Sequence, residues 1–189
     1  MISGSVEAVS PPLLVLGLGN ELLGDDGFGP VLVREIGRKY SEAASAVECL
    51  DGGTQGLALL GRISGRKALI VLDALMTGQT PGTVSVLAGE EIFQKSSHRS
   101  TTAHEGNAGE LLAAARLLQE LPEQIFLVGM EPETIRTQLG LSKVVEDALP
   151  AALERACQLI ESVRRQMSLP GDARPVPAPS PSLPPSALP

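Results

Sequence analysis

Residues 13–29 read LLVLGLGNELLGDDGFG and join an apolar run to a loop rich in glycine and aspartate. The run at residues 13–18 predicts a strand buried on both faces, because it shows no alternation with polar residues. A segment with helical periodicity follows at residues 28–40. A buried strand that passes through a short loop into a helix indicates an α/β fold.

The same alternation of strand and helix continues along the chain. Further strands are expected at residues 46–50, 67–72, 82–88 and 124–129, and further helices at 55–63, 109–121 and 142–167. Pro150 should kink or divide the last helix. Apolar strands separated by helices indicate a sheet that is covered on both faces. We therefore predict a single-domain α/β protein, a three-layer α/β/α sandwich with a mostly parallel central sheet.

Both ends of the chain depart from this pattern. We expect residues 1–12 to form a flexible lead-in to the folded domain. At the other end, residues 170–189 hold eight of the 15 prolines. Such a proline-rich stretch has little apolar surface to bury. We expect the folded domain to span residues 13–168 and a disordered tail to occupy residues 169–189.

Composition excludes several classes of partner. The formal charge is −7, and 2% of the residues are aromatic. An acidic chain disfavours binding to phosphate backbones or anionic membranes, and so few rings provide no base-stacking platform. Cys49 and Cys157 lie far apart, without the spacing of a thiolate metal site or a disulfide framework. No segment has the pattern of a signal peptide or a membrane span, so we expect a cytoplasmic protein with no nucleic-acid partner and no membrane insertion.

Acidic and imidazole side chains follow three of the predicted strands. Asp25 and Asp26 come after the first strand, Asp73 follows the third, and His104 follows the fourth at the start of the next helix. Ligands of open α/β sheets bind beyond the carboxyl ends of the strands, so these side chains are candidates for one site. Two carboxylates and an imidazole suit a divalent first-row cation such as Ni2+, Zn2+ or Co2+.

Each of these residues also has an ordinary structural explanation. Asp26 could cap the following helix, Asp73 could hold a turn, and His104 could lie on the surface. Asp25 is expected to face solvent or to cap the helix, because neighbouring side chains at a helix start point in different directions. His98 is the competing imidazole, but its polar setting, KSSHRS, predicts an exposed loop.

The glycine-rich loop lacks both standard patterns for phosphate binding. Gly17 and Gly19 begin a GxG motif, but the third glycine falls at Gly24, and no Lys-Ser or Lys-Thr pair follows. The two aspartates at the head of the helix would also repel a pyrophosphate. A dinucleotide site is therefore disfavoured.

Five motifs occur together in order: LVLGLGNELLGDDGFG, DGGTQGLALL, IVLDAL, His104 six residues before an acidic helix position, and LVGMEPE. This set resembles the hydrogenase maturation endopeptidases, which remove a C-terminal extension from the large-subunit precursor of nickel-iron hydrogenases. The resemblance covers residues 13–167, and it implies a three-layer α/β/α fold that binds a divalent metal.

The resemblance also implies roles for individual residues. Asp26, Asp73 and His104 would be the metal ligands and catalytic residues, with Asp at position 26 where some members have Glu. The substrate-binding residues would be Asn20, Asp51, Gly52 and Gly53. The structural alternative to substrate binding is that the glycines form a tight turn and that Asn20 satisfies the backbone of a turn.

The implied metal is Ni2+ supplied by the substrate, for which Zn2+ or another first-row ion could substitute. The implied partner is the hydrogenase large-subunit precursor, and we expect the enzyme to be a monomer. A water molecule polarised by the metal is the simplest nucleophile. The alternatives are a receiver-like, Mg2+-binding phosphorylatable domain, which needs a lysine near Glu131, and a noncatalytic nickel-binding maturation chaperone that uses the same ligands.

Overall fold

The computed structural model describes residues 11–40, 46–97 and 108–167. These residues form one five-stranded sheet in the order β2-β1-β3-β5-β4. The strands are β1 (Leu13–Leu18), β2 (Val47–Gly53), β3 (Ala68–Ala74), β4 (Val84–Ala88) and β5 (Gln124–Met130). All neighbouring strands pair in parallel except β4, which is antiparallel to β5. The proline-rich tail and all but the last two residues of the predicted lead-in lie outside the described residues.

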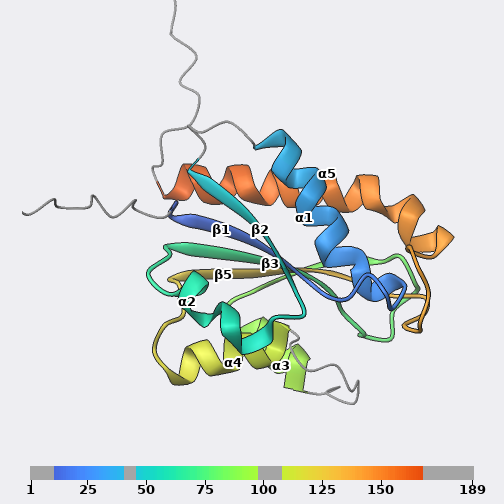
Figure 1. Cartoon of the computed structure of the whole chain (residues 1–189). Helices are drawn as coiled ribbons and strands as arrows, with labels where there is room; N and C mark the ends of the chain where they lie inside the picture. Colours follow the sequence, from blue (N-terminus) through green and yellow to red (C-terminus); the bar gives the residue numbers. More distant parts are fainter. Residues whose placement is uncertain (1–10, 41–45, 98–107, 168–189) are drawn as a thin grey trace, which may run out of the picture.

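Helices cover both faces of the sheet, so the predicted three-layer α/β/α sandwich is confirmed (Figure 1). Two short 3-10 turns, η1 (Asp25–Gly27) and η2 (Gly56–Leu59), precede α1 (Phe28–Lys39) and α2 (Leu60–Ile63). The later helices are α3 (Glu90–Ser97), α4 (Ala108–Leu117) and α5 (Lys143–Gln166). One face carries α1 and α5, and the other carries α2, α3 and α4.

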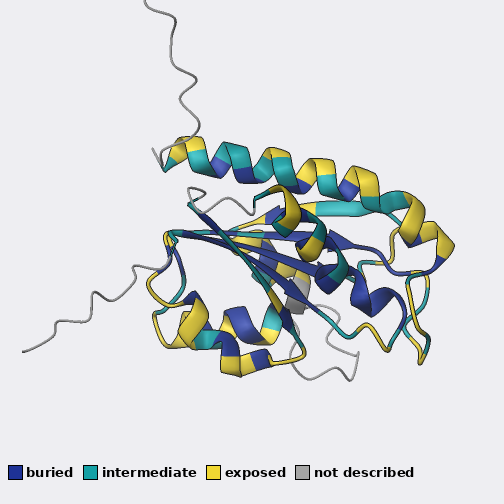
Figure 2. Ribbon diagram, turned by 45° about the horizontal axis from the view of Figure 1, so that its top comes forward, coloured by how far each residue is buried: buried dark blue, intermediate teal, exposed yellow. Residues whose placement is uncertain are grey.

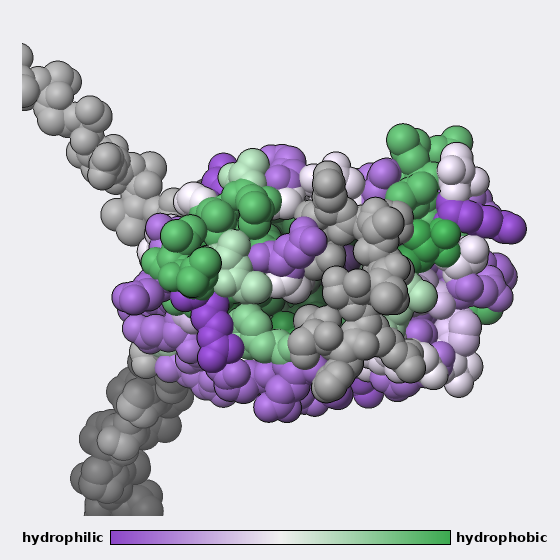
Figure 3. All heavy atoms as spheres, turned by 90° about the horizontal axis from the view of Figure 1, so that it is seen from below, coloured by the Kyte–Doolittle hydropathy of each residue, from purple (hydrophilic) through white to green (hydrophobic). Residues whose placement is uncertain are grey.

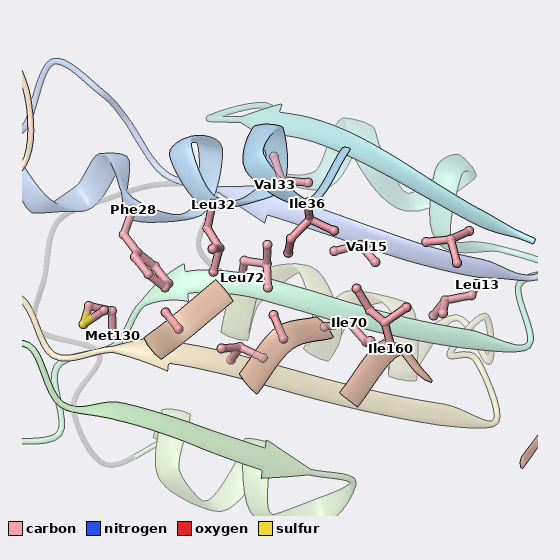
Figure 4. Packing of buried hydrophobic residues seen from close by; sticks show 14 of the residues in the cluster. Leu13, Val15, Phe28, Leu32, Val33, Ile36, Ile70, Leu72, Met130 and Ile160 are labelled. Carbon is pink, nitrogen blue, oxygen red and sulfur yellow. The ribbon is translucent and has the colours of Figure 1, made fainter. Parts of the chain in front are cut away.

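Two aliphatic cores lie on the two sides of the sheet. Leu13 and Val15 of β1 belong to the core beneath α1 and α5, whereas Leu14 and Leu16 belong to the core on the other side. This alternation follows from the two-residue repeat of a strand. Figure 4 shows the α1 side chains directed at the sheet, and Figure 2 shows buried strands beneath helices with exposed outer faces.

The glycine-rich run brings α1 very close to the sheet. A Cβ atom on Gly29 would lie 2.2 Å from the carbonyl oxygen of Leu18 and 2.3 Å from that of Leu72. A Cβ on Gly17 would lie 2.4 Å from the carbonyl oxygen of Gly29. Since no other residue fits at such distances, these glycines serve helix packing. The start of α1 and the preceding turn are therefore held against the carboxyl ends of β1 and β3.

Some details differ from the predictions. Of the two effects predicted for Pro150, a kink or a division of the last helix, division does not occur, since α5 runs unbroken through the proline. A proline inside a helix costs about 3 kcal/mol, but α5 buries Val145 before the proline and Ile160 and Val163 after it, and each such side chain contributes about 1.5–3 kcal/mol. The helix α3 was not predicted, because its apolar residues are confined to the adjacent Ile92 and Phe93. Strands β2 and β3 also extend beyond their predicted ends.

Candidate functional site

Asp73 lies inside β3, near its carboxyl end, and is 8% exposed. The sheet register pairs Gly17 of β1 with Leu72, so Asp73 stands one residue beyond that pair. Its Oδ2 atom accepts a hydrogen bond of 3.1 Å from the backbone N–H of Ala108, the first residue of α4. Burial raises the pKa of Asp73 to about 7, with a further contribution from the negative charge of Asp26, against the effect of the Ala108 hydrogen bond.

Asp26 occupies η1, between β1 and α1, and is also 8% exposed. Its Oδ2 atom accepts a hydrogen bond of 2.8 Å from the backbone N–H of Asn20. The Asn20 side chain closes the same loop, because its Oδ1 atom accepts the N–H of Leu22 at 3.0 Å. Asn20 thus orients the Asp26 carboxylate through its backbone and satisfies a turn through its side chain.

Asp26 and Asp73 form a pair of buried carboxylates at the ends of neighbouring strands. They are close enough for the charge of Asp26 to raise the pKa of Asp73. Bringing two like charges together in a buried site is unfavourable, and a bound cation would relieve the repulsion. The donor set therefore fits a divalent cation.

The predicted third ligand, His104, lies outside the described residues, as does His98. Within the described part of the chain, no group of three or more His, Cys, Asp or Glu side chains is arranged to hold a metal. The structure thus brings together Asp26 and Asp73 from the predicted set.

Asp25 does not face solvent and does not cap the helix, so that prediction is wrong. Its side chain is fully buried, and its Oδ2 atom accepts the backbone N–H groups of Glu133 at 2.9 Å and Thr134 at 3.0 Å. Its Oδ1 atom accepts the N–H of Ser142 at 2.6 Å. Asp25 therefore ties η1 to the segment between β5 and α5.

The predicted substrate-binding turn belongs to the end of β2. Exposed Asp51 accepts a hydrogen bond of 3.0 Å from Arg34 of α1, and its Oδ1 atom accepts the N–H of Gly53 at 3.1 Å. The carbonyl of Gly53 accepts the N–H of Gly19 at 3.0 Å, which joins this turn to the loop after β1. Gly52 is buried, and a Cβ there would lie 2.8 Å from Leu16, so this glycine serves core packing. Asp51 and Gly53 thus lie at the carboxyl ends of the parallel strands, as Asp73 does.

Sequence reasoning missed the structural role of Glu131, which directly follows β5. Its carboxylate accepts the N–H and the hydroxyl of Thr77, at 2.7 and 2.6 Å, and the N–H of Gly78 at 2.9 Å. Burial opposes ionisation, but these hydrogen bonds outweigh it and hold the pKa of Glu131 below its usual value. A receiver domain needs a lysine near this position. The carboxylate, which fixes the loop after β3, disfavours the receiver alternative.

The chain is also similar to several known proteins. A family model described as hydrogenase maturation protease (HycI) matches residues 30–159. The hydrogenase expression/formation protein HupD of Rhizobium leguminosarum bv. viciae is 36% identical over 154 residues, which cover 81% of this chain and 76% of HupD. The hydrogenase 2 maturation protease of Escherichia coli K12 is 36% identical over 144 residues, covering 76% and 87% of the two chains.

Solved structures show the same likeness. The hydrogenase maturating endopeptidase HybD of Escherichia coli superposes with a TM-score of 0.72 at 34% identity, covering 80% of this chain and 93% of HybD. The [NiFe] hydrogenase maturation protease HybD of Thermococcus kodakarensis gives a TM-score of 0.63 at 29% identity, with 78% and 98% covered. The family model spans β3, which carries Asp73, and begins four residues after Asp26. The chain belongs to the hydrogenase maturation protease family.

Proposed function

We propose that this protein is an endopeptidase that removes the C-terminal extension of a nickel-iron hydrogenase large-subunit precursor after nickel insertion. Membership of a peptidase family supports the reaction class. The observation that carries the proposal is the buried pair of Asp26 and Asp73 at the carboxyl ends of the strands, whose two carboxylates suit a divalent cation.

In this proposal, Asp26, Asp73 and His104 bind the nickel that the substrate brings. Backbone N–H groups of Asn20 and Ala108 hold the two carboxylates in place, so their orientation is set before the substrate arrives. Asp51 and Gly53 lie on the same edge and would contact the substrate peptide. Bound nickel, or Zn2+ or another first-row ion in its place, would polarise the water molecule that attacks the scissile carbonyl.

The setting of the reaction is also part of the proposal. We place the enzyme in the cytoplasm as a monomer. None of the helices in the described ranges combines the length and the apolar character that a bilayer crossing requires.

The direct test is incubation of the purified chain with nickel-loaded large-subunit precursor, followed by mass measurement of the large subunit. Loss of the C-terminal extension is the expected result. A precursor that binds the protein but keeps its full mass would instead favour the noncatalytic nickel-binding chaperone.

Nickel in the substrate is expected to control cleavage. The same precursor prepared without nickel should keep its extension, even when free Ni2+ or Zn2+ is added to the enzyme. Two carboxylates and one imidazole leave coordination positions that ligands from the substrate can fill. Mass measurement of paired precursors, with and without nickel, checks this. Efficient trimming of the nickel-free form would show that the enzyme acts as an ordinary metal-assisted peptidase.

The two histidines are expected to differ sharply in importance. His104→Ala should abolish processing through loss of a nickel ligand, whereas His98→Ala should leave the rate close to that of the wild type. Initial cleavage rates on nickel-loaded precursor, with circular dichroism as the folding control, measure this contrast. A wild-type rate for His104→Ala would remove this residue from the proposed site.

A further inference from the structure

Two loops far apart in the sequence are joined edge to edge beside the carboxylate pair. The first is residues 20–24 and the second is residues 133–141, and together we call them the clasp. The N–H of Gly24 donates to the carbonyl of Gln138 at 2.9 Å, and the N–H of Gln138 donates to the carbonyl of Leu22 at 3.0 Å. The N–H of Asp25 also donates to the carbonyl of Thr134 at 3.3 Å. These bonds give two isolated β-bridges, so the clasp has a defined shape outside the main sheet.

The clasp is also fixed relative to the proposed nickel site. The buried Asp25 carboxylate accepts the N–H groups of Glu133 and Thr134 at one end of the second loop and that of Ser142 just beyond its other end. Asp25 is adjacent in sequence to Asp26, and both belong to η1. A surface presented by the clasp is therefore held at a set position from the Asp26 carboxylate.

Two leucines project from the clasp into solvent. Leu139 is 81% exposed and Leu22 is 60% exposed. Within the described residues, neither side chain belongs to either core cluster, so core packing does not account for them. Figure 3 shows apolar surface at the right-hand end of the molecule, the end toward which β1, β3 and β5 run in Figure 1. The two leucines come from neighbouring points of the clasp, because the carbonyl of Leu22 accepts the N–H of Gln138, the residue before Leu139. Apolar side chains gathered on the surface at a fixed place are suited to contact another protein.

We propose that Leu22 and Leu139 form a docking surface for an apolar patch on the folded body of the large-subunit precursor. This inference rests on the proposed function, in which the precursor's C-terminal region reaches Asp26 and Asp73. The clasp begins directly beside that site, so the body of the same substrate is the surface that meets it. The contact made by the two leucines is apolar and so does not depend on the net charge of the chain, which is −7. Docking would then add affinity for the correct precursor beyond the contact with nickel.

The test compares two double variants. Leu22→Gln/Leu139→Gln removes the apolar surface of the clasp without adding charge. Leu117→Gln/Leu118→Gln is the matched control, because these leucines are 83% and 55% exposed. Leu117 is the last residue of α4 and Leu118 follows it, at the end of the sheet where β5 begins, away from the clasp. We expect the clasp variant to raise KM for nickel-loaded precursor at least about tenfold and to leave kcat nearly unchanged. Truncation of interface hot spots has an effect of this size on binding. The control should retain the wild-type KM.

Both pairs are also placed in an Asp73→Asn background, and the dissociation constant for the precursor is measured. This arm separates the two proposals. If the wild-type protein does not cut the precursor, the proposed endopeptidase activity fails, while a tenfold weaker binding of the clasp variant still supports docking. An unchanged KM and dissociation constant in the clasp variant would overturn the docking surface. So would a wild-type dimer that the clasp substitutions convert to monomers, because the leucines would then contact a second copy of this chain.

Discussion

Replacing Asp73 or Asp26 with asparagine is expected to abolish precursor processing and to leave the fold intact. Either substitution removes a negative charge from the proposed nickel site. Loss of an outer-shell partner of a metal ligand already costs about 10–100-fold, so loss of the ligand itself should exceed about 100-fold. Cleavage rates measured on nickel-loaded precursor by mass spectrometry check this expectation.

The fold is expected to survive because asparagine has nearly the same volume as aspartate and relieves the repulsion within the buried pair. Each asparagine also keeps a side-chain oxygen that can accept the N–H group of Asn20 or Ala108. Circular dichroism and thermal melting of both variants are the controls. An asparagine variant that is folded and cleaves at the wild-type rate would exclude that residue from the site, and an unfolded one would contradict the expected tolerance.

Replacing Asp25 with alanine is expected to destabilise the protein by at least about 3 kcal/mol, because three backbone N–H groups lose their acceptor and each loss costs about 1–3 kcal/mol. For a chain of this size, the melting temperature should fall by about 6–12 °C. Calorimetry or thermal circular dichroism measures the shift.

Asp51→Ala is the matched control for this effect. Asp51 also accepts hydrogen bonds, but it is exposed and its ionic partner is Arg34 on the surface. Exposed ion pairs contribute about 0–1 kcal/mol. A melting temperature for Asp25→Ala that matches that of Asp51→Ala would mean that the buried hydrogen bonds of Asp25 do not contribute as we infer.

Much of the fold could be read from the sequence because its signals are local. The apolar run at β1 is continuous, since both faces of a central parallel strand are covered. The predicted and observed bounds of β1 are the same. The proximity of Asp26 and Asp73 also follows from the sequence, because parallel strands end at one edge of the sheet and both aspartates follow apolar runs.

The roles of the remaining polar residues depended on contacts that local sequence does not encode. The partners of Asp25 lie 108, 109 and 117 residues away along the chain. Adjacent aspartates therefore look equivalent in the sequence, although one is directed at the segment before α5 and the other at Asn20. Glu131 likewise contacts Thr77 from 54 residues away.

Tertiary packing also decided where the elements end and whether a helix breaks. Strand β3 continues through Asp73 because β5 pairs with it as far as Ala74, which places a carboxylate inside a strand that local pattern would end at Leu72. The helix α5 continues through Pro150 because burial on both sides of the proline outweighs the lost backbone hydrogen bond. Sequence by itself determined the order of the strands and of the helices other than α3, and the edge on which the acids gather. The partner of each acid was decided by the tertiary structure, because a hydrogen bond depends on distance in space and not on separation along the chain.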